Sequence, residues 1–155
     1  MNDEAPSEPD ELQAIAMADA RRIYSETVIE YAIKPRNLGT MQDADGFARV
    51  TGPCGDTMEV WLEVKNSIIT DICFMTDGCG TSIASGSMMT ELAKGKSITE
   101  AGKISRQDIL DALGDLPEES RHCAELAAGT LKVAIRDYMV LQREPWKKAY
   151  NKYLR

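Results

Sequence analysis

The sequence predicts an α+β fold in which helices pack on one face of a small antiparallel three-stranded sheet. Residues 47–76 contain three segments in which apolar and polar side chains alternate with the period of two that marks half-buried strands. The segments that follow have the periodicity and capping residues of helices. Strands first and helices afterwards are typical of an α+β sandwich. The length of 155 residues suits one core, and we expect a single domain over residues 12–155.

The N-terminal part is expected to be disordered over residues 1–11, because it is acidic and contains two prolines. A helix is predicted over residues 12–33, where isoleucine and valine supply the apolar positions, and Pro35 ends it. Residues 34–46 combine asparagine, glycine and aspartate, and therefore predict a loop.

Three strands are predicted, over residues 47–52, 57–64 and 68–77. In the second strand the even-numbered residues are expected to face the helices, whereas the odd-numbered ones, Trp61 included, are expected to face solvent. In the third strand the even-numbered residues from Ile68 to Phe74 are expected on the inner face. The strands then form an antiparallel meander with one wet face.

Four helices are predicted after the strands, over residues 81–94, 105–114, 119–141 and 146–154. Thr81 or Ser82 is expected to cap the first of them, and Ser105 the second. In the last helix we expect the rings of Trp146 and Tyr150 to pack on the sheet, and the lysines to contact a partner protein.

Composition argues against two classes of partner. The formal net charge of −7 disfavours nucleic acid, because phosphate contacts need a basic surface. No apolar run approaches the roughly 18 residues that span a membrane, and the acidic N-terminus lacks the apolar stretch of a secretory signal. We therefore expect a cytoplasmic protein with no nucleic-acid or membrane partner.

The chain has four cysteines, Cys54, Cys73, Cys79 and Cys123, and one histidine, His122. Disulfides are not expected in a reducing compartment, and the absence of a C-x-x-C pair argues against a zinc ribbon or a thioredoxin-type site. Cys73 falls inside a predicted strand and is interpreted as a core residue. The other three fall at loop ends or helix starts, where a thiolate is accessible and the fold can bring them to one end of the sheet.

The surroundings of these three cysteines suit a metal site. Glycine flanks Cys54 on one side and Cys79 on both, which permits a bulky inorganic group to approach. Cys79 also precedes a predicted helix, whose unpaired N–H groups favour a thiolate. With Asp56 or His122 added, three thiolates suit zinc or an iron–sulfur cluster. From the residues alone, a turn role for Asp56 and a surface or capping role for His122 remain open.

Three stretches resemble the IscU/NifU-type iron–sulfur cluster assembly scaffold family: GPCGD (52–56), GCGTSIASGSMMTELAKGK (78–96) and HCAELAAGTLKVAIRDY (122–138). The resemblance covers the chain from about Ile23 to Tyr138. It implies a scaffold rather than an enzyme in the usual sense. Such a protein assembles a labile [2Fe–2S] cluster from iron and sulfur and then passes it to apo-proteins.

The resemblance also implies roles for individual residues. Cys54, Cys79 and Cys123 correspond to the cysteines that bind the nascent cluster or iron, and Cys123 to the one that receives persulfide sulfur from a cysteine desulfurase. Asp56 corresponds to an aspartate associated with cluster release, and His122 to an alternative ligand. Further expectations are zinc in the site when no cluster is bound, a ferredoxin as electron donor, apo iron–sulfur proteins as recipients, and a homodimer.

Two other functions compete with the scaffold function, and one stretch of the sequence differs from the family pattern. A zinc-bound sulfur acceptor of the SufU type is the main alternative, but that branch usually lacks the histidine kept here as His122 and carries an insertion. A Cys/His hydrolase is disfavoured, because neighbours on a helix point about 100° apart, so that His122 and Cys123 are expected to face different directions.

The run LPEES (116–120) replaces the L-P-P-V-K that a dedicated Hsp70-type chaperone recognises, so that chaperone is not expected as a partner.

Overall fold

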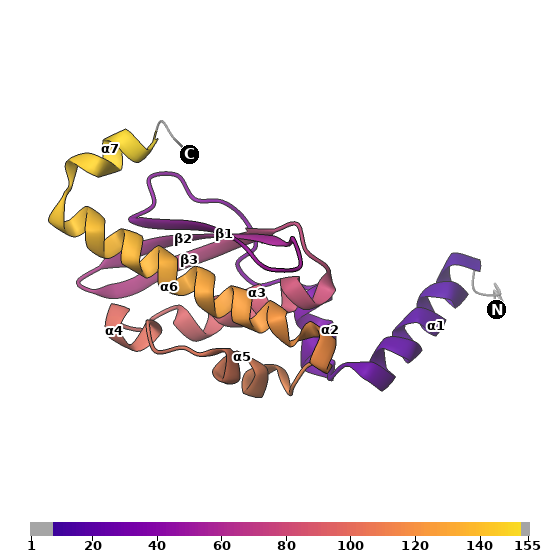
Figure 1. Ribbon diagram of the computed structural model, residues 1–155. Helices are drawn as coiled ribbons and strands as arrows, with labels where there is room; N and C mark the ends of the chain where they lie inside the picture. The colour runs from indigo at the N-terminus through magenta and orange to yellow at the C-terminus, as the bar shows by residue number, and fades with distance from the viewer. Residues whose placement is uncertain (1–7, 153–155) are drawn as a thin grey trace, which may run out of the picture.

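The computed structural model describes residues 8–152 and, among their side chains, those of residues 11–150. Figure 1 shows a small sheet with helices gathered on one side and α1 extending away from the body. In chain order the elements are α1 (Glu8–Ile23), α2 (Glu26–Ile33), β1 (Gly46–Thr51), β2 (Thr57–Lys65), β3 (Ile68–Thr76), α3 (Gly80–Ala93), α4 (Ile98–Ala101), α5 (Arg106–Leu113), the 3₁₀ turn η1 (Glu118–Ser120), α6 (Arg121–Arg143) and α7 (Trp146–Lys152).

The predicted fold class is confirmed. The three strands form one antiparallel sheet in the order β1-β2-β3. α6 packs on β1 and β2, and α3 packs on β3, so these two helices cover one face of the sheet. α2 packs on α3, and α5 packs on both α3 and α6, which gives a partial outer layer of helices.

Two contacts fix α6 across β1. A Cβ atom added to Gly46 would lie 2.6 Å from the Ala134 carbonyl oxygen, so the helix crosses where only a glycine fits. Beside this crossing, the N–H of Phe47 donates to Asp137 Oδ2 at 2.9 Å. Because α6 has 23 residues, its N-terminal turns extend along the sheet to the opposite end. That end carries the loop between β1 and β2, where Gly52 approaches Leu126 of α6.

The start of β3 differs from the prediction. Ile69 is fully buried and Ile68 is 37% exposed, whereas simple alternation placed Ile68 inside. A β-bulge shifts the register between Glu63 and Val64, so that Glu63 pairs with Asp71 and Val64 with Ile69. The extra residue reverses the phase of the alternation. A strict period of two cannot anticipate this, although the prediction holds further along the strand.

Trp61, predicted to face solvent, is only 9% exposed. It pairs with Phe47 of β1, and the two ring centroids are 5.3 Å apart. Facing aromatic side chains on neighbouring strands cover each other's apolar surface. At this point the outer face of the sheet is therefore less exposed to water than predicted from the charged residues on either side of Trp61.

The helix predicted over residues 12–33 is broken in two. Ser25 separates the parts and caps α2, where its Oγ accepts a hydrogen bond from the Val28 N–H at 3.1 Å. Serine favours this capping position because its hydroxyl satisfies an otherwise unpaired N–H. α1 also begins earlier than predicted, so residues 8–11, expected to be disordered, are helical. Residues 1–7 lie outside the described part of the chain.

The caps of the later helices were predicted with mixed success. Ser105 caps α5 in a capping box, and Gly114 ends it with φ = 79°, as expected. In α3, by contrast, the N-cap residue is Cys79, so that Thr81 and Ser82 lie inside the first turn. α4 and η1 are single turns that the sequence analysis did not predict, and α6 begins just after η1. Within residues 8–152, each helix is too short or too polar to cross a membrane.

The packing expected for the two rings of the C-terminal helix is wrong. Trp146 and Tyr150 are 67% and 66% exposed instead of packing on the sheet. Lys148 Nζ lies 3.2 Å from Asp45 Oδ1 in the loop before β1, so one of the lysines holds α7 to the body of the protein. The predicted end of this helix, at residue 154, lies outside the described residues.

Candidate metal centre

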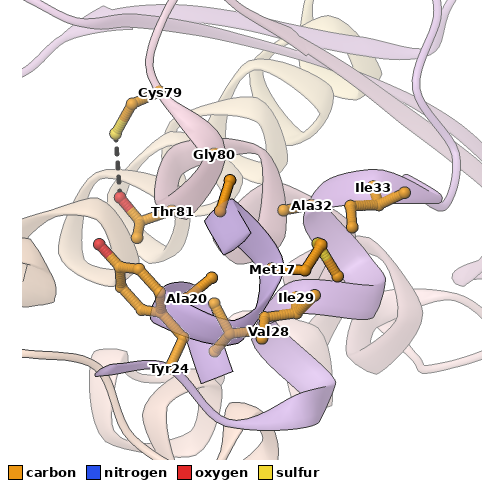
Figure 2. A pocket seen from close by; sticks show the side chains of 11 residues that line it. Met17, Ala20, Tyr24, Val28, Ile29, Ala32, Ile33, Cys79, Gly80 and Thr81 are labelled. Atoms are coloured by element: carbon orange, nitrogen blue, oxygen red, sulfur yellow. Dashed lines mark hydrogen bonds between the residues drawn. The ribbon is translucent and has the colours of Figure 1, made fainter. Parts of the chain in front are cut away.

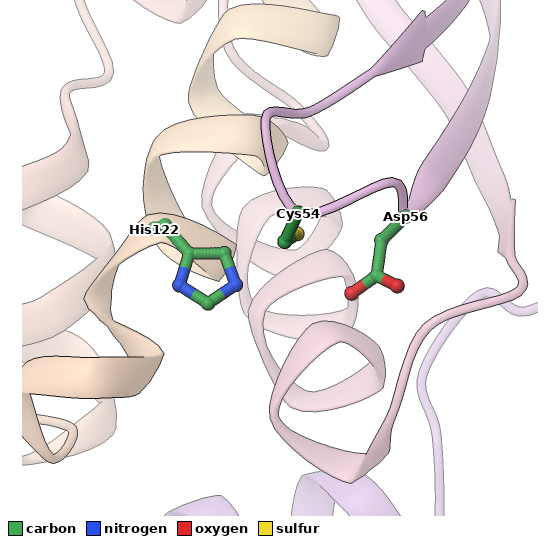
Figure 3. A group of neighbouring side chains, drawn as sticks. All are labelled: Cys54, Asp56 and His122. Carbon is green, nitrogen blue, oxygen red and sulfur yellow. The ribbon is translucent and has the colours of Figure 1, made fainter.

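The loop between β1 and β2 presents two of the predicted ligands, Cys54 and Asp56. Two backbone hydrogen bonds close this loop, from the Gly52 N–H to the Asp56 carbonyl oxygen at 2.8 Å and from the Gly55 N–H to the Gly52 carbonyl oxygen at 3.0 Å. Gly55 has φ = 89°, a left-handed conformation that glycine adopts without strain. The tight turn places both side chains opposite the first residues of α6 (Figure 3).

Cys54, Asp56 and His122 form a compact group of three donors. One sulfur, one carboxylate oxygen and one imidazole nitrogen all lie within 4.8 Å of one another. Bonds of about 2.0–2.3 Å to a tetrahedral metal ion would place such donors roughly 3.5 Å apart. Small rotations of these partly exposed side chains are therefore enough to bind one ion between them (Figure 3).

The other two predicted ligands, Cys79 and Cys123, are joined by a threonine hydroxyl. Thr81 Oγ1 lies 3.0 Å from Cys79 Sγ and 3.4 Å from Cys123 Sγ. Cys79 is exposed at the start of α3, whereas Cys123 is only 1% exposed. Both thiols thus contact the same hydroxyl, and one of them is exposed to solvent whereas the other is buried.

Ser82 connects these two groups. Its Oγ donates to Cys123 Sγ at 3.3 Å and to Asp56 Oδ2 at 3.4 Å. Cys123 Sγ in turn lies 3.6 Å from His122 Nε2. The five residues predicted from the sequence therefore form one continuous cluster of side chains at one end of the sheet.

One expectation about this cluster is wrong. His122 and Cys123 were expected to face different directions because they are neighbours on a helix. Their ring nitrogen and sulfur are 3.6 Å apart, because the imidazole is long enough to span the angle between the two side chains. A one-residue step of about 100° separates the Cα–Cβ directions but not the ends of long side chains.

The local environment separates the acidities of the thiols. Partial burial tends to raise the pKa of Cys79, but hydrogen bonds from the Thr81 hydroxyl and from backbone N–H groups outweigh it, so the pKa is lowered. Burial raises the pKa of Cys123, despite hydrogen bonds from Ser82 and Thr81 that act in the opposite direction. Burial and the nearby Asp71 carboxylate raise the pKa of Cys73 to about 11. Cys73 is only half-buried and lies opposite Trp61 on the outer face of the sheet, so the core position predicted for it is wrong, although its raised pKa disfavours the thiolate near pH 7.

We expect these differences to appear as different alkylation rates in the metal-free protein. Near pH 7, iodoacetamide should modify Cys79 at least about ten-fold faster than Cys123, because only the thiolate reacts and Cys79 is also exposed. Raising the pH should narrow this gap, since the thiolate fraction of Cys123 is still increasing where that of Cys79 has levelled off. Quenched time points and peptide mass spectrometry measure both rates, with Cys73 as a slow internal reference. Equal rates for Cys79 and Cys123 would contradict the prediction.

An apolar cavity of about 400 Å³ lies directly beside Cys79. α1 contributes Met17 and Ala20, α2 contributes Ile29, and the start of α3 closes one side with Gly80 and Thr81 (Figure 2). The exposed thiol of Cys79 therefore borders an open apolar surface as well as water.

Sequence reasoning missed Thr81 and Ser82 as parts of the site. They were interpreted as helix caps, although both are buried, with exposures of 6% and 0%, and both hydroxyls contact thiols. The available signal was two adjacent hydroxyl residues after GCG, at the start of a helix whose first turn faces the other predicted ligands. Only the position of α6 decides that these hydroxyls meet Cys123 instead of capping α3.

A small α+β domain that gathers three thiols, a carboxylate and an imidazole at one end of its sheet has the features of a metal- or cluster-binding protein. The family model described as NifU-like N terminal domain matches residues 23–144, and the chain therefore belongs to that family.

Several named relatives are similar over most of the chain. Iron-sulfur cluster assembly scaffold protein IscU 1 of Archaeoglobus fulgidus is 49% identical over 117 residues, which cover 75% of this chain and 76% of that protein. The IscU scaffold protein of Aquifex aeolicus is 43% identical over 122 residues, or 77% and 78% of the two chains. The relative from Drosophila melanogaster, named an iron-sulfur cluster assembly enzyme IscU, is 43% identical over 127 residues, or 79% and 82%.

Solved structures share the fold. The N-terminal part of a nitrogen-fixing NifU-like protein from Brucella abortus superimposes with a TM-score of 0.61, covering 76% of this chain and 94% of that one at 23% identity. A putative scaffold protein for the SUF system from Fervidobacterium islandicum gives a TM-score of 0.60, with 75% and 98% covered at 23% identity. At this level of identity the likeness concerns the fold alone.

Proposed function

We propose that this protein is a scaffold on which an iron–sulfur cluster is assembled and from which the cluster is passed on. The observation that carries the proposal is the cluster of Cys54, Asp56, Cys79, His122 and Cys123 at one end of the sheet. The names of the relatives support the same function. The protein is proposed as a carrier of its cargo rather than an enzyme.

The donor set suits a cargo that must be released. Cys54, Cys79 and Cys123 supply soft thiolates, and Asp56 supplies a hard carboxylate that binds iron less strongly. Cys54 is exposed and Asp56 is partly exposed, so water reaches the bound group from this side. Such a set holds a [2Fe–2S] cluster less tightly than four thiolates do. His122 lies close enough to replace one donor.

Cys123 is proposed as the thiol that receives sulfur, under a condition that its burial imposes. Its thiolate would attack the outer sulfur of a persulfide on a cysteine desulfurase; a new S–S bond forms on Cys123, and the donor's cysteine leaves as a thiolate. At 1% exposure, Cys123 must first become accessible, whereas Cys79 already is. The apolar cavity beside Cys79 offers a place where an apolar side chain of the donor protein can bind and open the site.

The identity of the sulfur acceptor can be decided by mass spectrometry. Protein incubated with a cysteine desulfurase and cysteine should gain 32 Da on the peptide that contains Cys123. The Cys79→Ser variant should keep this product, and the Cys123→Ser variant should lose it. Persulfide found on Cys79, and retained in Cys123→Ser, would move the role of acceptor to the exposed thiol.

The remaining partners follow from the chemistry. Sulfur arrives from a persulfide as a neutral atom and must gain two electrons to become sulfide, and we propose a ferredoxin as their source. Apo iron–sulfur proteins are the proposed recipients, and a second copy of this chain is the proposed partner in a homodimer. Because the site needs reduced thiols, we propose a reducing compartment such as the cytoplasm.

Anaerobic reconstitution tests the proposed function directly. Protein mixed with a desulfurase, cysteine, ferrous iron and thiol should turn brown and show charge-transfer absorption of a [2Fe–2S] cluster, which should move to an added apo-ferredoxin. Replacing Cys54 or Cys79 by serine should reduce that absorption at least about ten-fold, because a ligand is lost. Cys73→Ser is the matched control and should behave like the parent. A parent protein that stays colourless would contradict the proposal.

A zinc-bound sulfur acceptor is the second candidate. The observation in its favour is the compact Cys54, Asp56 and His122 group, which fits a single tetrahedral ion without any cluster. Protein purified without oxygen would then contain about one zinc per chain and would accept persulfide sulfur without forming a coloured product. Cluster formation and transfer to an apo-protein would exclude this candidate as the main function.

A further inference from the structure

We infer that Ser82 is a positioning residue that holds Asp56 and Cys123 together as one preformed unit. The inference rests on the proposed function, since it concerns how the same donors are arranged before iron and sulfur arrive. Ser82 is fully buried in the first turn of α3, and its Oγ contacts both residues, at 3.4 Å from Asp56 Oδ2 and 3.3 Å from Cys123 Sγ.

Ser82 also touches a third member of the cluster. Its backbone N–H hydrogen-bonds to the thiol of Cys79. One residue thus contacts donors from the β1–β2 loop, from the start of α3 and from the start of α6. No side-chain bond is present between Asp56 and Cys123 themselves among the described contacts, so the hydroxyl is what connects the loop to α6 at this point.

The close approach of Ser82 is built into the backbone before α3. A Cβ atom on Gly78 would lie 2.5 Å from Ser82 Oγ and 3.0 Å from Asp56 Oδ2. Gly78 lacks a positive φ, so the glycine is needed for space and not for its backbone angles. Any larger residue at position 78 would push the hydroxyl and the carboxylate apart.

A single hydroxyl hydrogen cannot point fully at two acceptors at once. Ser82 therefore shares its hydrogen between Asp56 and Cys123, or alternates between them. When Asp56 turns toward an iron ion, the hydrogen becomes available to the sulfur of Cys123. In this way Ser82 couples the position of the Asp56 carboxylate to that of the buried Cys123 thiol.

The first test measures the metal-free protein. In Ser82→Ala, alkylation of Cys123 should become about five-fold slower relative to Cys54 in the same sample, because the hydroxyl that donates a hydrogen bond to the reacting sulfur is gone. Ser85→Ala is the matched control. Ser85 is equally buried one turn further along α3, and its Oγ has no hydrogen-bond partner among the described residues, so the same chemical change there leaves the cluster untouched.

The second test measures binding of Co²⁺, whose sulfur-to-metal charge-transfer absorption reports thiolate ligands. Ser82→Ala should weaken binding about five-fold, and should change the intensity of that absorption, whereas Ser85→Ala should change neither. In an Asp56→Ala background the effect of Ser82→Ala on affinity should shrink, because the partner it positions is absent. A residue that merely supports the fold would lower the melting temperature without this dependence on Asp56.

Gly78→Ala provides a second variant that displaces the same hydroxyl from the other side. It should shift Cys123 alkylation and Co²⁺ affinity in the same direction as Ser82→Ala. The inference is overturned if Ser82→Ala and Gly78→Ala match Ser85→Ala in both measurements. Neither measurement needs an assembled cluster. If the protein never forms a cluster but its variants show these shifts in Cys123 alkylation and Co²⁺ affinity, the proposed function is refuted and the role of Ser82 is not.

Discussion

Replacing Asp56 by alanine is expected to lengthen the lifetime of the assembled cluster by at least about ten-fold, which corresponds to about 1.4 kcal/mol in the barrier to loss. The carboxylate is the hardest donor of the set, and it lies at the partly exposed edge of the site next to Cys54. With Asp56 removed, the imidazole of His122 is near enough to take its place. A softer ligand set then binds iron more tightly.

The measurement is the decay of charge-transfer absorption of reconstituted protein in the presence of a chelator. Asp71→Ala is the matched control, because Asp71 is an exposed carboxylate of β3 that pairs with Lys94 and takes no part in the site. Its half-life should equal that of the parent. If the cluster of Asp56→Ala decays as fast as the parent's, Asp56 is not the ligand that makes the cluster labile.

The second large effect concerns stability: Gly86→Ala is expected to destabilise the protein, and Gly129→Ala to stabilise it. Both glycines lie inside helices, α3 and α6, where alanine is intrinsically favoured by about 1 kcal/mol. A Cβ on Gly86 would lie 2.3 Å from the ring of Phe74, whereas nothing lies within 4 Å of a Cβ on Gly129. Steric overlap therefore makes the change in stability unfavourable at residue 86, and helix propensity makes it favourable at residue 129.

The ring of Phe74 cannot withdraw from this contact. Phe74 is fully buried between Val60, its neighbour across β2, and the Asn37–Gly39 segment, to which its backbone N–H and carbonyl are both hydrogen-bonded. Overpacking at such a site costs about 2 kcal/mol, or roughly 6 °C in melting temperature for a domain of this size. Thermal and urea unfolding of the two variants measure the difference.

A double variant distinguishes steric overlap from other causes. Phe74→Leu alone should destabilise by removing ring volume, but in the Gly86→Ala background its cost should be smaller, since the smaller side chain makes room for the new methyl group. Additive losses, or a stable Gly86→Ala protein, would show that the contact between these residues does not limit packing at the interface of α3 and the sheet.

The strands and the helix caps were predictable because their signals are local. The alternation of residues 57–64 gave the inner face of β2, and Ser105 and Gly114 marked the ends of α5, since capping depends on a few neighbouring residues. The break at Ser25 also had a local signal, in a serine three residues before Val28. It was overlooked because the apolar spacing continues through it.

Other features had no local signal. The bulge opposite Val64 depends on how β2 pairs with β3, and the burial of Trp61 depends on Phe47 lying across from it. The exposure of Trp146 depends on where the ion pair between Lys148 and Asp45 fixes α7, a contact between residues 103 positions apart. Alternation and helical spacing describe one segment at a time, so such contacts are beyond their reach.

The candidate site divides in the same way. By itself, the sequence determined which residues are proposed to carry the chemistry, because its cysteines and its histidine are few and lie in recognisable stretches. Only the tertiary structure decided that Cys123 is buried while Cys79 is exposed, that the imidazole of His122 lies beside the thiol of Cys123, and that the hydroxyls of Thr81 and Ser82 join the donors. Burial and hydrogen bonding arise where α3, α6 and the β1–β2 loop meet, and three segments so distant in the chain are placed against one another only by the packed core.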